Sequence, residues 1–318
     1  MRLHAVDPAN PDPDIIADAA ARLRIGELVA FPTETVYGLG ANALDVEAVA
    51  RIFAAKGRPS YNPVIVHVPD VDAARCVVTH WPDAADKLAA AFWPGPLTLV
   101  LPKAPQIPDL VSAGLPLIGV RVPAHPVALA LLRAARVPVA APSANKSNQL
   151  SPTSAPHVLR GLADVDGVVL DGGDCAVGIE STVIDLSTDV PKLLRPGGVS
   201  VEALEPRRSP GALDRHYAPR ARVQMCAAGD GIALATSIDA LRSAGARVGV
   251  VAWSDFDLPF NGDVSVRQLS GDAVEYAAQL FATLHELDAR GVSAIVVESV
   301  PDLPIWDAVR DRLRRAAS

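Results

Sequence analysis

The stretch from Phe31 to Pro63 concentrates side chains that could hold an anion. Hydroxyl groups follow a predicted buried strand, and an amide and two basic groups stand at and beyond the end of a predicted helix. These residues are Thr33, Thr35, Lys56, Arg58 and Asn62. Arginine offers a rigid fork of donors and lysine a point charge, which together match phosphate oxygens. The stretch therefore predicts a phosphate site, although Lys56 and Arg58 could instead only complement the negative end of the helix dipole.

Two further polar segments stand next to predicted strands. Ser143 and Asn145 follow the strand predicted at 138–142, and ligands of open α/β sheets bind beyond the carboxyl ends of strands. Ser181 and Thr182 open another predicted strand, where their hydroxyls could bind a ligand carboxylate or hydroxyl. The alternatives are an ordinary Ser/Asn-rich turn for the first segment and a capping or turn role for the second.

Two ionisable residues interrupt otherwise apolar strand patterns, Arg121 in IGVRV and His67 in VIVHV. A buried arginine costs free energy unless it is paired. Arg121 therefore predicts either a structural Asp or Glu partner or a bound carboxylate. For His67 the alternatives are a ligand-binding group and a core histidine whose hydrogen bonds are satisfied.

The composition limits the class of protein. The chain has 318 residues, enough for two domains at about 100–200 residues each. A net charge of −7 and a pI near 5.5 argue against a global electrostatic grip on nucleic acid, but allow a local basic patch. Three widely separated cysteines predict neither a zinc site nor disulfides, and indicate a reducing cytoplasm. A polar, proline-rich N-terminus and the lack of an apolar run of about 18 residues argue against a signal peptide and a membrane span.

The sequence does not match several motifs of nucleotide-binding proteins and hydrolases. The segment GLGANA at 38–43 resembles a dinucleotide fingerprint, but it does not directly follow the preceding strand and no acidic residue follows at the required spacing. The chain also lacks a GxxxxGK[ST] loop and a GxSxG elbow. A P-loop nucleotidase and an enzyme with a serine nucleophile are therefore not supported.

Hydrophobic periodicity predicts alternating helices and strands followed by a strand-rich end. Helices are predicted at 13–25, 46–56, 82–92 and 126–135, and strands at 28–32, 64–68, 97–101, 118–122, 138–142, 167–173, 181–186 and 192–197. This order favours a mixed sheet with helices on it.

The composition changes near Glu205. Residues 207–222 are rich in arginine and proline and have no helix or strand period, which predicts a linker between a first domain at 1–206 and a small α/β domain at 223–318. Tyr217 in this linker could stack or hydrogen-bond over a site, so the linker could act as a lid.

Seven segments, in order over residues 13–206, resemble one family. They are FPTETVYGLGANA, KGRP…NPVIVHV, WPGPLTLVL, GVRVP…HPVA, PVAAPSAN, GIESTVIDL and LRPG. This part of the chain looks like the YrdC-type catalytic domain of the threonylcarbamoyl-AMP synthase family. The SPG…RHYAP linker and the small C-terminal domain look like the long, two-domain form. The resemblance implies an open, twisted, mixed α/β sheet with helices, and a smaller Rossmann-like α/β C-terminal domain.

The resemblance also implies a reaction and its residues. L-threonine, bicarbonate or CO2, and ATP give L-threonylcarbamoyladenylate and pyrophosphate, a nucleotidyl transfer that needs no enzyme nucleophile. The implied L-threonine-binding residues are Thr35, His67, Arg121, Ala141 (backbone) and Ser181. The implied ATP-binding residues are Arg58, Asn62, Leu117 (backbone), Ser143, Ser151, Arg195 and Tyr217. The KxR and SxN signatures, predicted to orient phosphates and metal in catalysis, are Lys56, Arg58, Ser143 and Asn145.

The remaining expectations concern cofactors and partners. Mg²⁺ is expected to arrive with ATP, since no protein carboxylate cluster is visible for it. The implied partners are a downstream threonylcarbamoyl transferase complex and the tRNA whose adenosine beside the anticodon (position 37) is modified, with contact to tRNA or double-stranded RNA. The protein is expected in the cytoplasm, without a membrane. The alternatives are an RNA-binding module without catalysis and a different carbamoylating or adenylating enzyme on the same fold.

Overall fold

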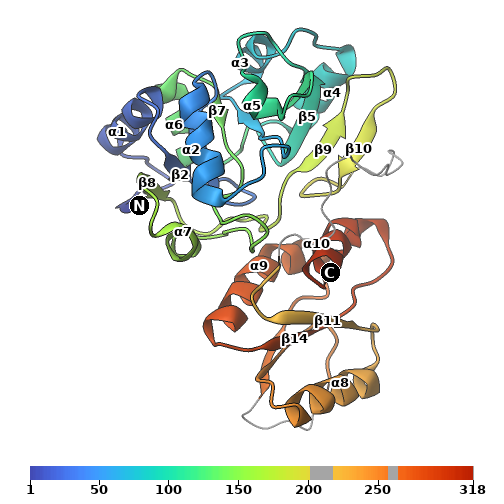
Figure 1. Ribbon diagram of the computed structural model, residues 1–318. Coiled ribbons are helices and arrows are strands. Elements are labelled where there is room, and N and C mark those ends of the chain that lie inside the picture. The colour runs from blue at the N-terminus through green and yellow to red at the C-terminus, as the bar shows by residue number, and fades with distance from the viewer. Residues whose placement is uncertain (201–217, 257–263, 318) are drawn as a thin grey trace. The chain divides into compact units, whose positions relative to one another are not determined.

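The computed structural model describes residues 1–200, 218–256 and 264–317 (Figure 1). The chain forms two compact units. The large unit contains Met1–Ser147 and the described residues from Ser151 to residue 200, and the C-terminal unit contains Asn148–Leu150 and the described residues from Ala218 on. The predicted domain boundary at residue 206 lies outside the described residues, so that boundary stays a prediction. Among the described helices, none is long and apolar enough to cross a membrane.

The large unit is built on a mixed sheet, as the sequence predicts; among the described residues this sheet has ten strands, of which β1 and β3 were not predicted. Its strands are β1 (Arg2–Ala5), β2 (Val29–Phe31), β3 (Gly38–Asn42), β4 (Val66–His67), β5 (Leu97–Pro102), β6 (Leu117–Arg121), β7 (Val139–Ala140), β8 (Val168–Asp171), β9 (Thr182–Asp185) and β10 (Lys192–Arg195). Their order in the sheet is β1-β8-β2-β3-β7-β4-β6-β5-β9-β10. Strand β4 pairs parallel to β6 and antiparallel to β7, which places strands distant in sequence next to one another.

Helices cover the two faces of this sheet unequally. They are α1 (Pro13–Arg24), α2 (Val46–Lys56), α3 (Val71–Cys76), α4 (Asp83–Phe92), α5 (Asp109–Ser112), α6 (Pro126–Ala135) and α7 (Ala155–Leu162). The four predicted helices correspond to α1, α2, α4 and α6. Helix α2 shows why such predictions succeed: Asp45 accepts hydrogen bonds from the first-turn N–H groups, and Gly57 ends the helix at a φ of 59°.

The face that carries His67 is covered over only half of its width. In the described part of the chain, the hydrophobic cluster on this face combines α1 and α6 with residues of β2, β7 and β8, and has no member from β4, β5, β6 or β9. Figure 1 shows α1 and α6 beside β2 and β7. Over β4, β6, β5 and β9, the alternate residues Ile65, Gly119, Val100 and Val183 stay half-buried. We call this half the open face; the opposite face packs into the main core.

Strand β3 lies in the segment GLGANA, which resembles a dinucleotide fingerprint. The sequence did not predict a strand there. Glycine is depleted in strands, so the pattern gave no signal. A Cβ at Gly40 would lie only 2.9 Å from Phe31 Cε1 and from Val139 Cγ1. Glycine therefore lets the ring of Phe31 cross β3 and reach His67, with ring centroids 6.1 Å apart.

The C-terminal unit is a smaller α/β sandwich, as expected. Its parallel sheet has the order β11-β14-β12-β13. The elements are β11 (Arg222–Cys226), α8 (Gly231–Ser243), β12 (Val248–Ala252), β13 (Val264–Gln268), α9 (Ala273–Ala289), β14 (Ala294–Glu298), a 3₁₀ turn (Pro304–Trp306) and α10 (Asp307–Ala317). The buried carboxylate of Glu298 accepts hydrogen bonds from Gly229, Trp253 and Ser254, and so ties the loops at the carboxyl ends of the strands.

The close approach at Gly40 generates a stability prediction. Gly40→Val should lower the free energy of unfolding by about 1–3 kcal/mol, because the added atoms overlap Phe31 and Val139. Urea unfolding checks this. Gly161→Ala in α7 is the matched control, since its new Cβ would meet no atom closer than 3.9 Å, and it should stabilise the protein by about 0.5–1 kcal/mol. A Gly40→Val protein as stable as the wild type would contradict the packing argument.

Candidate active site on the open face

Arg121 is the last residue of β6 and lies on the open face. It has an acidic structural partner, Glu34, which was one of the two alternatives predicted for it. Its Nε donates to Gly95 O at 3.2 Å, and its Nη2 donates to Glu34 Oε1 at 2.7 Å. The side chains of Arg121 and Glu34 are only 4% and 11% exposed. A guanidinium carries five N–H donors, so this ion pair leaves donors with which Arg121 could bind a ligand carboxylate.

His67 lies directly opposite Arg121 in the pairing of β4 with β6. It is buried, and its Nδ1 has no hydrogen-bond partner among the described residues. Burial, and then the positive charge of Arg121, lower the pKa of His67 to about 3, so the imidazole is neutral near neutral pH. A buried polar atom without a partner needs an explanation. At Nδ1, His67 therefore differs from the satisfied core histidine of the alternative, and a ligand could supply the partner of that atom.

Ser181 and Arg195 meet at β9 and β10, which follow β5 on the side of β6 away from β4. The Ser181 hydroxyl lies 2.8 Å from Thr98 Oγ1 and accepts a hydrogen bond from Arg195 Nη2 at 3.1 Å. Arg195 also donates to the Ser181 carbonyl oxygen from Nη2 at 2.8 Å. The pairing of Leu99 with Val120 puts Thr98 next to Arg121. Thr98 was not among the predicted site residues, although a single polar residue inside the apolar segment LTLVL was an available signal.

The turn after β2 fixes which atom Thr35 can offer. Thr33 Oγ1 lies 2.6 Å from the carbonyl oxygen of Val36 and 2.8 Å from Thr35 Oγ1. A carbonyl oxygen can only accept, so Thr33 donates to Val36, and Thr35 must then donate to Thr33. The remaining lone pairs of the Thr35 hydroxyl are thus acceptors suited to an N–H or O–H of a ligand.

Lys56 connects the end of α2 to the loop after β7. Its Nζ lies 2.5 Å from the carbonyl oxygens of Ser143 and Asn145, and 3.3 Å from Asn145 Oδ1. Burial, and then the charges of Arg58 and Lys146, lower the pKa of Lys56 well below its usual value. The three oxygens act in the opposite direction, since only the ammonium form can donate to all of them. Lys56 therefore does more than complement the helix dipole: it holds Ser143 and Asn145 in place.

Arg58 and Asn62 meet beyond α2. Arg58 donates from Nε to Asn62 O at 3.1 Å and from Nη2 to Pro63 O at 2.8 Å. Both Arg58 and Asn62 are half-buried. Arg58, which is predicted to bind phosphate, thus donates to carbonyl oxygens of its own loop and lies next to Asn62.

The other predicted positions differ in what they can offer. The Ala141 N–H donates to Ile65 O at 2.9 Å, so a backbone contact to a ligand would have to use the Ala141 carbonyl. Ser151 is fully buried and donates to Glu180 Oε1 at 2.5 Å; the sequence analysis missed Glu180. Leu117 opens β6 and is half-buried. Tyr217 lies outside the described residues.

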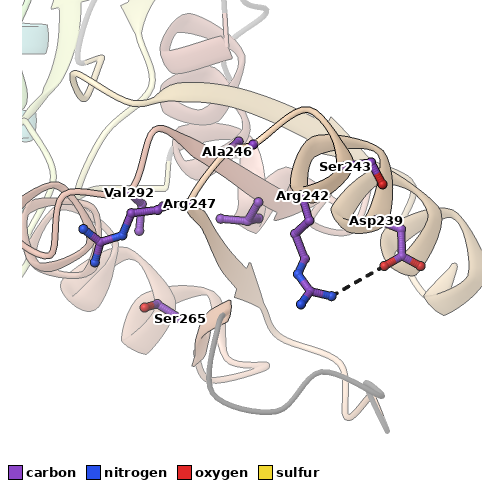
Figure 2. A pocket seen from close by; sticks show the side chains of 9 residues that line it. Asp239, Arg242, Ser243, Ala246, Arg247, Ser265 and Val292 are labelled. Atoms are coloured by element: carbon purple, nitrogen blue, oxygen red, sulfur yellow. Dashed lines mark ion pairs between the residues drawn. The ribbon is translucent and has the colours of Figure 1, made fainter.

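A pocket of about 620 Å³ in the C-terminal unit contains none of the predicted residues (Figure 2). It is lined by Asp239, Arg242, Ser243, Gly245, Ala246, Arg247, Val248, Ser265 and Val292. It lies at the amino ends of β12 and β13, whereas ligands of such sheets bind at the carboxyl ends. Arg242 forms an ion pair with Asp239 at 3.8 Å. The open face, not this pocket, is therefore the candidate site.

Metal binding by protein side chains alone receives no support in the described part of the chain. There, no three His, Cys, Asp or Glu side chains lie together in a group that could hold a metal ion. A divalent cation at the open face would need most of its ligands from a bound molecule such as a nucleotide triphosphate.

The neutral His67 generates a pH prediction. Its pKa is about 3 in the folded protein and about 6.5 in the unfolded chain. Below pH 6.5 the unfolded chain therefore binds a proton that the folded protein excludes, and the free energy of unfolding should fall by up to about 1.4 kcal/mol per pH unit. In His67→Gln this part of the slope should vanish in unfolding measured from pH 7 to 4. The exposed His80→Gln should keep it; an unchanged slope in His67→Gln would refute the assignment.

The contacts of Lys56 generate a second prediction. Lys56→Met leaves two carbonyl oxygens and the Asn145 amide without their donor, which should cost about 1–3 kcal/mol of unfolding free energy. Lys87→Met removes the same charge at an exposed position of α4 and should change stability by less than about 0.5 kcal/mol. Equal stability of both variants in urea would show that Lys56 does not hold the loop.

Two family models match the chain. One, described as "Telomere recombination" and labelled Sua5_yciO_yrdC, matches residues 21–197, which is more than half of the chain. The other, described as "Threonylcarbamoyl-AMP synthase, C-terminal domain", matches residues 179–318.

Whole proteins are similar over nearly the full length. A threonylcarbamoyl-AMP synthase of Pyrococcus abyssi is 42% identical, with 94% of this chain and 93% of that protein aligned. One of Bacillus subtilis is 41% identical, with 96% and 93% aligned. The crystal structure of P. abyssi Sua5 complexed with L-threonine superposes with a TM-score of 0.91 at 40% identity, covering 100% of this chain and 98% of that one. The chain therefore belongs to the threonylcarbamoyl-AMP synthase family.

Proposed function

We propose that this chain converts L-threonine, bicarbonate or CO2, and ATP into L-threonylcarbamoyladenylate and pyrophosphate. The observation that carries the proposal is the pair of Arg121 and His67 on the open face: a buried guanidinium with donors to spare beside a buried imidazole whose Nδ1 has no partner among the described residues. Such a pair suits a small zwitterion with a carboxylate and a further polar group. The family membership supports the same substrate.

The amino acid is proposed to bind at the carboxyl ends of β4 and β6. Arg121 takes the carboxylate, because a charge-assisted contact to a guanidinium fork is strong and directional. His67, Thr35 and Ser181 bind the remaining polar groups, with the Thr35 hydroxyl as acceptor and the Ala141 carbonyl beside it. The open face leaves room for these contacts because α1 and α6 do not extend over it.

The nucleotide is proposed to bind between the KxR and SxN signatures and β10. The residues proposed to contact ATP are Arg58, Asn62, Leu117, Ser143, Ser151, Arg195 and Tyr217. Arg58 would have to exchange its two carbonyl partners in the 58–63 loop for phosphate oxygens. Lys56 Nζ and the Asn145 N–H both donate to the carbonyl oxygen of Ser143 and so hold it in place. Because Arg195 contacts Ser181 directly, the nucleotide and amino-acid regions share a hydrogen-bonded boundary.

The proposed chemistry requires positioning rather than an enzyme nucleophile. The threonine amine and CO2 form a carbamate, and a carbamate oxygen attacks the α-phosphorus of ATP. The bond from the α-phosphorus to the oxygen that bridges to the β-phosphorus breaks, and pyrophosphate leaves with its electron pair. The protein contributes by aligning the two substrates and by placing donors where negative charge develops. We propose that Mg²⁺ arrives with ATP, whose phosphate oxygens supply ligands for it.

The product is proposed to serve a later step. An acyl adenylate is an activated donor, so a partner threonylcarbamoyl transferase would consume it to modify the tRNA adenosine beside the anticodon, in the cytoplasm. Contact of this chain with tRNA or double-stranded RNA belongs to the same proposal. So does the division into a catalytic domain at 1–206, a linker at 207–222 and a C-terminal domain at 223–318.

Pyrophosphate release from ATP tests the function. Release should require both L-threonine and bicarbonate, and L-serine should replace L-threonine poorly. Arg58→Ala removes a charge-assisted phosphate contact worth about 1.5–3 kcal/mol, so kcat/KM for ATP should fall about 10–100-fold. Arg133→Ala, at an exposed position of α6, should leave it unchanged.

Other outcomes would favour the alternatives. Release that does not depend on L-threonine would indicate a different adenylating enzyme. No release, together with tight tRNA binding that weakens steeply with salt, would indicate an RNA-binding module.

A further inference from the structure

Glu34 is a charged residue of the turn after β2 (Thr33, Glu34 and Thr35) to which the proposed function gives no role. It stands between Thr33 and Thr35, and its side chain is only 11% exposed. Oε1 accepts from Arg121 Nη2 at 2.7 Å, and Oε2 accepts from the Ala124 N–H at 2.9 Å. The Glu34 carbonyl oxygen accepts from Val177 N at 2.7 Å. Each end of this residue is thus fixed by a different segment of the large unit.

These contacts fix Arg121 along one side of its guanidinium. Nε is bound to Gly95 O and one Nη2 donor to Glu34. Among the described residues, no hydrogen bond involves Nη1. Three donors remain, the second one of Nη2 and the two of Nη1, and of these the Nη2 donor and one Nη1 donor are parallel at the end of the planar fork. That end is the edge a carboxylate binds with both oxygens.

We propose that Glu34 is a positioning residue for L-threonine: it holds the Arg121 guanidinium so that its outer edge faces the substrate carboxylate. The inference rests on the proposed function, since it deepens the role of Arg121. Glu34 also balances the buried charge of Arg121 before substrate arrives, because an unpaired buried cation would be costly. A carboxylate is needed here, because both of its oxygens accept a hydrogen bond, one from Arg121 and one from the Ala124 N–H. The amide of a glutamine has only one oxygen, so its NH₂ group would face one of these two donors and that contact would be lost.

Calorimetric binding of L-threonine to the full chain tests this without requiring turnover. Glu34→Gln should weaken L-threonine binding by at least about tenfold, while binding of L-threoninol, which lacks the carboxylate, should change by less than about twofold. Glu47→Gln removes the same charge at an exposed position of α2 and should change neither. Thermal unfolding of each variant reports whether it is folded. If Glu34→Gln does not fold, Glu34→Asp keeps the charge and should show a smaller loss with the same selectivity.

A double-mutant cycle separates positioning from a general structural role. If Glu34 acts through Arg121, Glu34→Gln should cause no further loss of L-threonine affinity when Arg121→Lys is already present, because lysine has no fork to orient. Additive losses, equal losses for L-threonine and L-threoninol, or unchanged affinity in Glu34→Gln would each overturn the inference. So would a wild-type chain that does not bind L-threonine. A wild-type chain that binds L-threonine but releases no pyrophosphate would overturn the proposed function alone, and the cycle would still test Glu34.

Discussion

A buried cation on a half-covered sheet is the constraint around which the large unit is arranged. Arg121 sits at the end of β6 with 4% of its side chain exposed, where an unpaired charge would be strongly destabilising. The turn after β2 meets this constraint by bringing Glu34 to it from a distant part of the sequence. Helices α1 and α6 pack on the other half of this face, and their hydrophobic cluster includes no described residue of β4 or β6. In the proposed function, one ion pair therefore serves both stability and ligand binding.

Two further cations of the proposed site form hydrogen bonds within the protein. Lys56 uses its ammonium group on the carbonyl oxygens of Ser143 and Asn145, and Arg58 donates to its own loop. Each contact orders a segment that would otherwise have to be ordered when substrate binds. Preformed loops of this kind lower the entropic cost of assembling a site. This fits a reaction in which the protein aligns two substrates and supplies no nucleophile.

Much of the fold could be read from local signals. The cap at Asp45, the stop at Gly57 and the apolar strand patterns around His67 and Arg121 all led to elements that the structure contains. Strand β3 could not be read, because its glycines serve the ring of Phe31 rather than any local preference. The short helices α3, α5 and α7 were also missed, since a few residues give too little periodicity.

The sequence by itself determined the mixed α/β class and the family, and it predicted the residue types of the site. It left open whether Arg121 has a structural partner and whether the ring nitrogens of His67 all have hydrogen-bond partners. Only the tertiary structure decided these questions, by placing Glu34 at 2.7 Å from Arg121 and leaving His67 Nδ1 without a partner among the described residues. It also turned Lys56 toward a loop 87 residues away. The physical reason is that hydrogen bonds and burial depend on which segments meet across the sheet, and strand pairing over such distances leaves no local trace in the sequence.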